Sequence, residues 1–151
     1  MFDRFLTMNV PTLAVWNGRA IAGGVFMGLC HDKIVMRDDP SIFAELNELN
    51  IGIPFCYGMS QIPIQTLNHS TARHLLMGNK LNSQDCFKEG VVRELFKDTA
   101  QLEKTIQEFA EERASQANSR PVMKASKTNI NMKLHEALNG PQQTDMNHVI
   151  A

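Results

Sequence analysis

The chain has 151 residues, so one domain with one core is expected, because a chain of this size buries about 68–70% of the surface that it exposes when unfolded. Its 15 lysine and arginine residues nearly balance 16 aspartate and glutamate residues, and the net charge of −1 argues against a general attraction to nucleic acid or to an anionic membrane. No apolar run approaches the roughly 18 residues of a membrane span, and the first residues lack the apolar core of a secretory signal.

The first third of the chain alternates short strands with a buried helix. Residues 2–9 are expected to form the last turns of a helix, after which Pro11 favours extended backbone. The apolar run Leu13–Trp16 is typical of a strand that is covered on both faces. The nearly all-apolar segment Gly23–His31 predicts a buried helix, and Lys33–Arg37 follows as a second strand.

The rest of the chain is mostly helical. Residues 42–44 are a candidate strand, and residues 45–52 have too few periodic apolar positions for a helix. Helices are expected over 58–67, from an N-cap at Ser70 to Met77, from an N-cap at Ser83 to Gly90, over 101–118, and from Pro121 to about residue 138. This order predicts an α/β domain over residues 1–139, helical from about residue 100, with a polar tail over 140–151.

Neither the cysteines nor the histidines predict a disulfide or a metal site. Cys30, Cys56 and Cys86 are odd in number and form no Cys-x-x-Cys pair, which indicates a reducing, intracellular environment. None of the five histidines stands in a zinc-binding pattern, and His31 is expected to cap the carbonyls at the end of its helix.

The candidate chemistry of the first third lies at Gly23 and Gly24. Two glycines at the start of a helix leave backbone N–H groups bare at the positive end of the helix dipole, where they favour a negatively charged oxygen. Alternatively, the glycines only permit close packing of the helix against a strand. The residues alone leave both explanations open.

The landmarks around these glycines resemble the enoyl-CoA hydratase/isomerase (crotonase) superfamily. They occur in the order Asn17-Gly18-Arg19-Ala20, Gly23-Gly24, His31-Asp32, Leu76-Met77-Gly78-Asn79-Lys80-Leu81 and Glu89-Gly90-Val91-Val92. The resemblance runs from about residue 11 to residue 138 and covers the second part of the family's domain. It implies a crotonase-like ββα spiral, truncated at its N-terminus, with a helical C-terminal region.

The resemblance also implies roles for residues near the glycines. In the family, two backbone N–H groups stabilise the enolate of an acyl-CoA thioester, and Gly23 falls at the position of one of them. The implied substrate-binding positions are Ala20, Ile21, Ala22, Gly24 and Phe26. Coenzyme A would enter as part of the substrate, without a separate cofactor or metal. The second N–H group of the family comes from a segment further upstream. We therefore expect one of three explanations: another polypeptide supplies this segment, the sequence is incomplete, or the chain is a non-catalytic relative.

The glutamates decide the reaction class that the resemblance implies. Hydratases of this family use two glutamates, and the first position is Phe26 here, which cannot act as a base. The second position falls on Glu48, before Ile51-Gly52-Ile53-Pro54, with Glu45 as the competing candidate and a solvated loop glutamate as the alternative. A single carboxylate resembles the delta-3, delta-2-enoyl-CoA isomerases, in which it moves a proton from carbon 2 to carbon 4 inside a dry pocket.

Two functions follow from the resemblance. The first is an enoyl-CoA isomerase of fatty-acid β-oxidation, with Glu48 as the proton shuttle and Gly23 as the oxyanion donor. The second is a catalytically inactive accessory subunit of a larger assembly. Since a fold without its early strands leaves a sheet edge uncovered, we expect obligate association with the same or a related chain. The expected compartment is a mitochondrion or peroxisome, although no targeting signal is recognisable.

Overall fold

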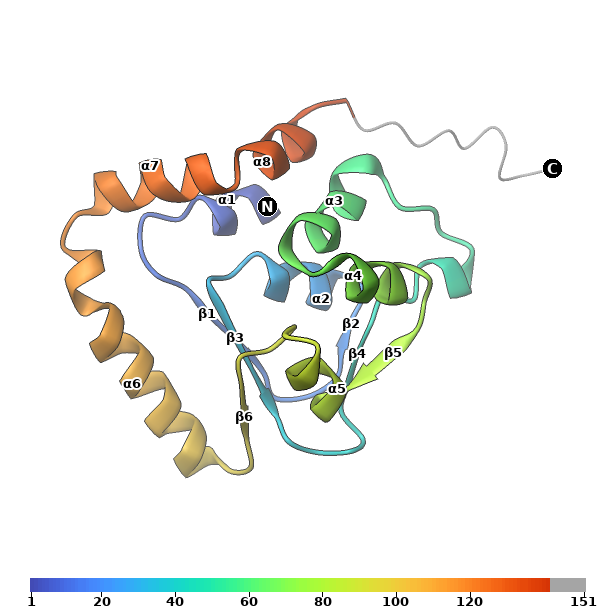
Figure 1. The fold of residues 1–151 in the computed structure, drawn as a ribbon, viewed down its shortest axis with the longest axis horizontal. Helices are drawn as coiled ribbons and strands as arrows, with labels where there is room; N and C mark the ends of the chain where they lie inside the picture. Colours follow the sequence, from blue (N-terminus) through green and yellow to red (C-terminus); the bar gives the residue numbers. More distant parts are fainter. Residues whose placement is uncertain (142–151) are drawn as a thin grey trace.

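The computed structural model describes residues 1–141, which fold into two small sheets surrounded by helices (Figure 1). The elements in chain order are α1 (Phe2–Leu6), β1 (Leu13–Trp16), β2 (Ala20–Ile21), α2 (Gly23–Leu29), β3 (Lys33–Arg37), β4 (Phe43–Glu45), the 3-10 helix η1 (Leu49–Ile51), α3 (Tyr57–Thr66), α4 (His69–Leu76), β5 (Lys80–Asn82), α5 (Ser83–Lys88), β6 (Glu94–Phe96), α6 (Thr99–Ala117), α7 (Arg120–Ile130) and α8 (Met132–Asn139). The predicted polar tail over 140–151 lies almost wholly outside the described residues.

The two sheets have consecutive strands, β1 and β2, at their open edges. One sheet has the order β1-β3-β6 and is parallel throughout. The other has the order β2-β4-β5, in which β4 runs parallel to β2 and antiparallel to β5. Within residues 1–141, β1 and β2 are each paired on one side only, and Val15 and Ile21 are 36% and 39% exposed. The prediction that Leu13–Trp16 is covered on both faces is therefore wrong, because one face of this edge strand is open at Val15.

The core forms around α2, which packs against β1. Val25, Phe26 and Leu29 are buried on this helix. Gly28 lies so close to the Trp16 ring that a Cβ atom there would stand 2.5 Å from it, a distance that no side chain tolerates without movement. The close helix–strand approach therefore depends on Gly28.

Two short helices begin at caps other than those predicted. The N-cap of α4 is Asn68 rather than Ser70, and the N-cap of α5 is Asn82 rather than Ser83. Each asparagine side chain accepts a backbone N–H of the first turn at 2.9 Å, which satisfies a donor that the helix itself leaves unpaired. Asparagine and serine are similar as caps, so the positions could not be separated by residue type.

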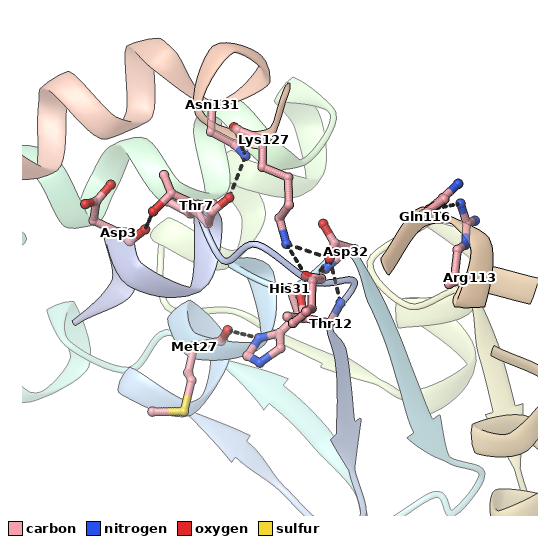
Figure 2. Close-up of polar contacts among 12 residues, drawn as sticks. Asp3, Thr7, Thr12, Met27, His31, Asp32, Arg113, Gln116, Lys127 and Asn131 are labelled. Carbon is pink, nitrogen blue, oxygen red and sulfur yellow. Dashed lines mark hydrogen bonds and ion pairs between the residues drawn. The ribbon is translucent and has the colours of Figure 1, made fainter. Parts of the chain in front are cut away.

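The predicted helix from Pro121 to about residue 138 is two helices, α7 and α8, which are separated at Asn131. The Asn131 side chain donates to the carbonyl of Lys127 at 2.9 Å and to that of Leu6 at 3.2 Å. Side-chain bonds of this kind compete with helix continuation. In Figure 1, α7 and α8 lie beside α1, and Figure 2 shows the polar contacts that join these segments. Among the described residues, no helix has the length and apolar character that a membrane span requires.

Candidate functional site

The site predicted around Gly23 and Glu48 lies where β2 and β4 end. These strands pair in parallel, and the Ala22 N–H continues the pairing with a 2.8 Å hydrogen bond to the Glu45 carbonyl. Parallel neighbours end at the same edge of a sheet, where α/β folds place ligands. Gly23 follows β2 after one residue and Glu48 follows β4 after two, so the structure brings the two predicted catalytic residues to one edge.

Ala22 holds the turn between β2 and α2 in a strained conformation. Its φ of 50° and ψ of −117° make it the one non-glycine residue with positive φ in residues 1–141. Such a conformation costs about 1–3 kcal/mol and persists only where the surroundings fix it. Here the Ala22 carbonyl accepts the N–H groups of Val25 and Phe26, and its N–H is bound to Glu45. The strained turn determines how the Gly23 peptide leaves the sheet.

Gly23 and Gly24 begin α2 at the surface of the fold. Both residues are accessible to solvent, neither N–H has an acceptor within the described part of the chain, and a Cβ atom on either would meet nothing within 4 Å. The explanation that these glycines permit close helix–strand packing is therefore wrong, since Gly28 has that role. The first N–H groups of a helix have no partner inside it, so these two are available to an oxygen from outside.

Phe26, in the first turn of α2, lies in the core. It is fully buried, and the rings of Phe2 and Phe55 meet its ring edge-on, each with centroids 6.1 Å away. An aromatic cluster thus stands where hydratases of the resembled family have a carboxylate. The other predicted substrate-binding residues differ in access: Ala20 is buried, Ala22 is half-buried, and Ile21 and Gly24 are exposed.

Glu48 is a buried carboxyl group without a full set of partners. The residue is 7% exposed, and its Oε2 has no hydrogen-bond partner within the described residues. Burial raises the pKa of this carboxyl above its usual range. Its backbone carbonyl accepts the Ile53 N–H at 2.8 Å, and Gly52, with φ of 74°, turns the chain between them. The alternative of a solvated loop glutamate is therefore wrong.

Glu45, the competing candidate, has a different environment. It is 8% exposed, but Lys80 Nζ lies 3.8 Å from its carboxylate and Asn50 Nδ2 lies 3.4 Å away. Lys80 and the side chain of Asn50 thus compensate the charge of Glu45, whereas Glu48 has no ion pair within the described residues and only its own backbone N–H opposes the effect of burial on its pKa. Of the two, Glu48 has the environment that better suits a proton carrier, because burial raises its pKa and so increases its affinity for a proton.

Other reactive groups of the described chain show no comparable arrangement. All three cysteines are free, and burial raises the pKa of Cys30 and of Cys86 to about 12, which makes both thiols unreactive near neutral pH. Residues 1–141 hold no group of three or more histidine, cysteine, aspartate or glutamate side chains placed to bind a metal ion. The predicted capping role of His31 is confirmed, since its Nδ1 lies 2.8 Å from the Met27 carbonyl.

Sequence reasoning missed two parts of the site. Nothing in the sequence indicates a positive φ at Ala22, because alanine rarely adopts one. The contact between Phe26 and Phe55 joins residues that are distant in the chain and carries no local pattern. Together with the bare N–H groups and the buried carboxyl, these features can support proton transfer next to a carbonyl whose oxygen is held by N–H donors.

Known proteins resemble this chain in sequence and in fold. A family model described as Enoyl-CoA hydratase/isomerase matches residues 1–149. The chain is 32% identical to Enoyl-CoA delta isomerase 3 of Arabidopsis thaliana over 98 residues, which are 64% of this chain and 41% of that protein. It is also 32% identical to the peroxisomal Enoyl-CoA delta isomerase 2 of the same plant over 89 residues, 58% of this chain and 37% of that protein.

Solved structures show the same fold at lower identity. An enoyl-CoA hydratase of Mycobacterium ulcerans superposes with a TM-score of 0.78 at 20% identity, over 91% of this chain and 58% of that one. An enoyl-CoA hydratase of Bacillus halodurans gives a TM-score of 0.74 at 21% identity, over 91% of this chain and 53% of that one. The chain thus spans about half the length of the proteins that it resembles.

Proposed function

The chain belongs to the enoyl-CoA hydratase/isomerase family, and from this premise we propose that it is an enoyl-CoA isomerase that moves a double bond from position 3 to position 2 of an acyl-CoA in fatty-acid β-oxidation. Coenzyme A enters as part of the substrate, and the proposal includes no separate cofactor. The observation that carries it is Glu48, a buried carboxyl with a raised pKa and an unpartnered oxygen at the same sheet edge as the bare Gly23 N–H.

In the proposed reaction, Glu48 takes a proton from carbon 2 of the 3-enoyl thioester. The electron pair of the broken C–H bond moves into a dienolate, and negative charge develops on the thioester oxygen, which accepts a hydrogen bond from the Gly23 N–H. The same carboxyl returns the proton at carbon 4, which leaves the double bond between carbons 2 and 3. One carboxylate is sufficient, because the proton that it gains in the first step is the proton that it gives up in the second.

The aromatic cluster favours isomerisation over hydration. Adding water across a double bond requires a water molecule that is held and activated, and Phe26 offers neither a charge nor a hydrogen bond for it. The edge-on contacts of Phe26 with Phe2 and Phe55 surround this position with apolar rings in place of a carboxylate.

A second N–H donor and much of the coenzyme A surface belong, in the family, to a segment upstream of the landmarks in this sequence. We propose that this segment comes from polypeptide that adds to the open edges of β1 and β2. Val15 and Ile21 support this, because they leave apolar side chains exposed on strands with one free side each. The partner would be the same chain or a related one.

The open edges also favour a second candidate, a catalytically inactive accessory subunit that uses them for assembly alone. Under either function the proposed compartment is a mitochondrion or peroxisome, and the name of the peroxisomal Arabidopsis relative supports a peroxisome.

The two functions are separated by measuring conversion of a 3-enoyl-CoA into the 2-enoyl-CoA with the associated protein. Glu48→Gln keeps the size of the side chain but cannot carry the proton, so the rate should fall about 10²–10⁴-fold. Glu45→Gln is the matched control and should retain activity. No conversion by folded wild-type protein would exclude the isomerase and leave the accessory role, and full activity of Glu48→Gln would remove Glu48 from the mechanism.

A further inference from the structure

The side chain of Asn50 ties the loop that carries Glu48 to a distant turn of the fold. Asn50 lies in η1, shortly after Glu48, and its Nδ2 donates to the Gly78 carbonyl at 3.0 Å. Gly78 lies in the turn between α4 and β5 (Figure 1). The backbone bonds of the loop are local, since the Glu48 carbonyl accepts the N–H groups of Ile51 and Ile53. Asn50 therefore joins this local turn to a residue 28 positions further along the chain.

The amide of Asn50 also packs directly against Gly78. A Cβ atom on Gly78 would stand 2.7 Å from Asn50 Oδ1 and 2.8 Å from Asn50 Nδ2, which is closer than real Cβ atoms approach. Gly78 has a φ of 79°, a left-handed conformation that favours glycine. Glycine at this position thus gives both the backbone turn that the contact requires and the space for the Asn50 amide.

The buried position of Glu48 needs such a tether. Its carboxyl is buried with an Oε2 that has no hydrogen-bond partner within residues 1–141, whereas the next two residues, Leu49 and Asn50, are exposed. A buried polar group without a partner costs free energy, which the loop would recover by turning the carboxyl into water. The contact of Asn50 with Gly78 opposes that movement, and Asn50 Nδ2 also lies 3.4 Å from Glu45 Oε1 in β4.

We propose that Asn50 is a positioning residue, which holds η1 against the turn between α4 and β5 and so keeps the Glu48 carboxyl at the sheet edge where Gly23 also lies. Asn50 acts through Glu48 and touches no reacting atom. The kinetic consequence of this inference rests on the proposed isomerase function, in which Glu48 carries the proton. The placement of Glu48 does not, because it can be measured without a substrate.

The test follows the side-chain carboxyl carbon of Glu48 by NMR during a pH titration without acyl-CoA. Glutamate labelled at this carbon provides the signals, and the signal that is lost in Glu48→Gln identifies Glu48. Asn50→Ala removes the tether, and Gly78→Ala places a Cβ atom in the space of the Asn50 amide. Asn47→Ala is the matched control, because Asn47 lies in the same loop and its side chain makes no hydrogen bond within the described residues.

In Asn50→Ala the titration midpoint of Glu48 should move down toward the range of a solvated glutamate, because water then reaches the carboxyl. Gly78→Ala should move it in the same direction, and Asn47→Ala should titrate as the wild type does. The inference is overturned if the Glu48 midpoint is unchanged in Asn50→Ala, or if Asn47→Ala lowers it equally. If Gly78→Ala does not fold, the comparison of the two asparagine variants decides the question.

The kinetic measurement uses a 3-enoyl-CoA with the same variants. Asn50→Ala should lower kcat several-fold with little change in KM, and the rise of kcat with pH should move to lower pH together with the Glu48 titration. An Asn50→Ala variant with wild-type kcat and an unshifted pH profile would contradict the positioning role. If folded wild-type protein converts no 3-enoyl-CoA, the proposed function fails, and the titration still decides whether Asn50 places Glu48.

Discussion

Replacing Ala22 with glycine tests the strained turn that presents Gly23. Glycine adopts a φ of 50° with a ψ of −117° at little cost, whereas alanine in this conformation loses about 1–3 kcal/mol. The substitution also makes the unfolded chain more flexible, which opposes the gain by about 0.4–1 kcal/mol. The net expectation is that Ala22→Gly stabilises the fold by about 1 kcal/mol.

The measurement is thermal unfolding at one protein concentration, because association would otherwise shift the midpoint. For a domain of this length, about 1 kcal/mol corresponds to a rise in Tm of roughly 2–4 °C. Ala20→Gly, in the strand that leads into this turn, is the matched control, since Ala20 is buried with an ordinary negative φ. The control should lower the Tm, because glycine there only adds flexibility and removes a packed methyl group.

An unchanged or lower Tm for Ala22→Gly would refute the strain at this turn. It would mean that the backbone conformation of Ala22, which sets the position of Gly23, has no energetic cost. A drop in Tm for both alanine variants would lead to the same conclusion, because ordinary backbone flexibility would then explain them together.

Three further predictions concern stability. Because burial raises the pKa of Glu48, the folded chain binds the Glu48 proton more tightly than the unfolded chain does, and the free energy of unfolding falls as pH rises from the unfolded pKa to the folded one. Urea unfolding at about pH 4 and pH 7 should therefore show that Glu48→Gln becomes more stable than wild type at the higher pH. The control Glu45→Gln should show no such gain. Gly28→Ala should cost about 1–3 kcal/mol in the same assay, because its Cβ overlaps the Trp16 ring, and an unaltered midpoint would contradict the packing described. Lys127→Ala should lower the free energy of unfolding by about 1–3 kcal/mol, which is less than the loss of a fully buried ion pair costs, because the Asp32 carboxylate that pairs with Lys127 is 38% exposed. An unchanged free energy of unfolding would show that the ion pair does not stabilise the fold.

The parts of the fold that could be predicted are those with local patterns. Lys33–Arg37 forms β3 with the predicted bounds, because a short apolar run ends there at two aspartates and a proline. The family resemblance and the crotonase-like α/β fold are confirmed. The strands β2, β5 and β6 were not predicted, since two or three residues are too few to show an alternating pattern.

Within the site, the glycines were predictable and the environments of the carboxylates were not. The order of motifs pointed to Gly23 and Glu48, but it could not distinguish a solvated Glu48 from a buried one. Burial depends on contacts with distant segments, and the loop around Glu48 has no periodicity that reports them. The difference between Glu48 and Glu45 likewise depends on Lys80, which comes from β5 and has no sequence relation to either glutamate.

β2 bears on both proposed functions, the isomerase and the accessory subunit. It is two residues long and pairs only with β4 within the described residues, and the Ala22–Glu45 bond next to it joins the Gly23 side of the site to the Glu48 side. A strand this short, paired on one side, fixes the site through few hydrogen bonds. A strand that pairs with its free edge would add hydrogen bonds and stabilise the site. An accessory subunit would need that edge but would have no use for a buried carboxyl with an unpartnered oxygen. Because keeping Glu48 buried costs stability at neutral pH, its presence favours catalysis, with association through β2 as its support.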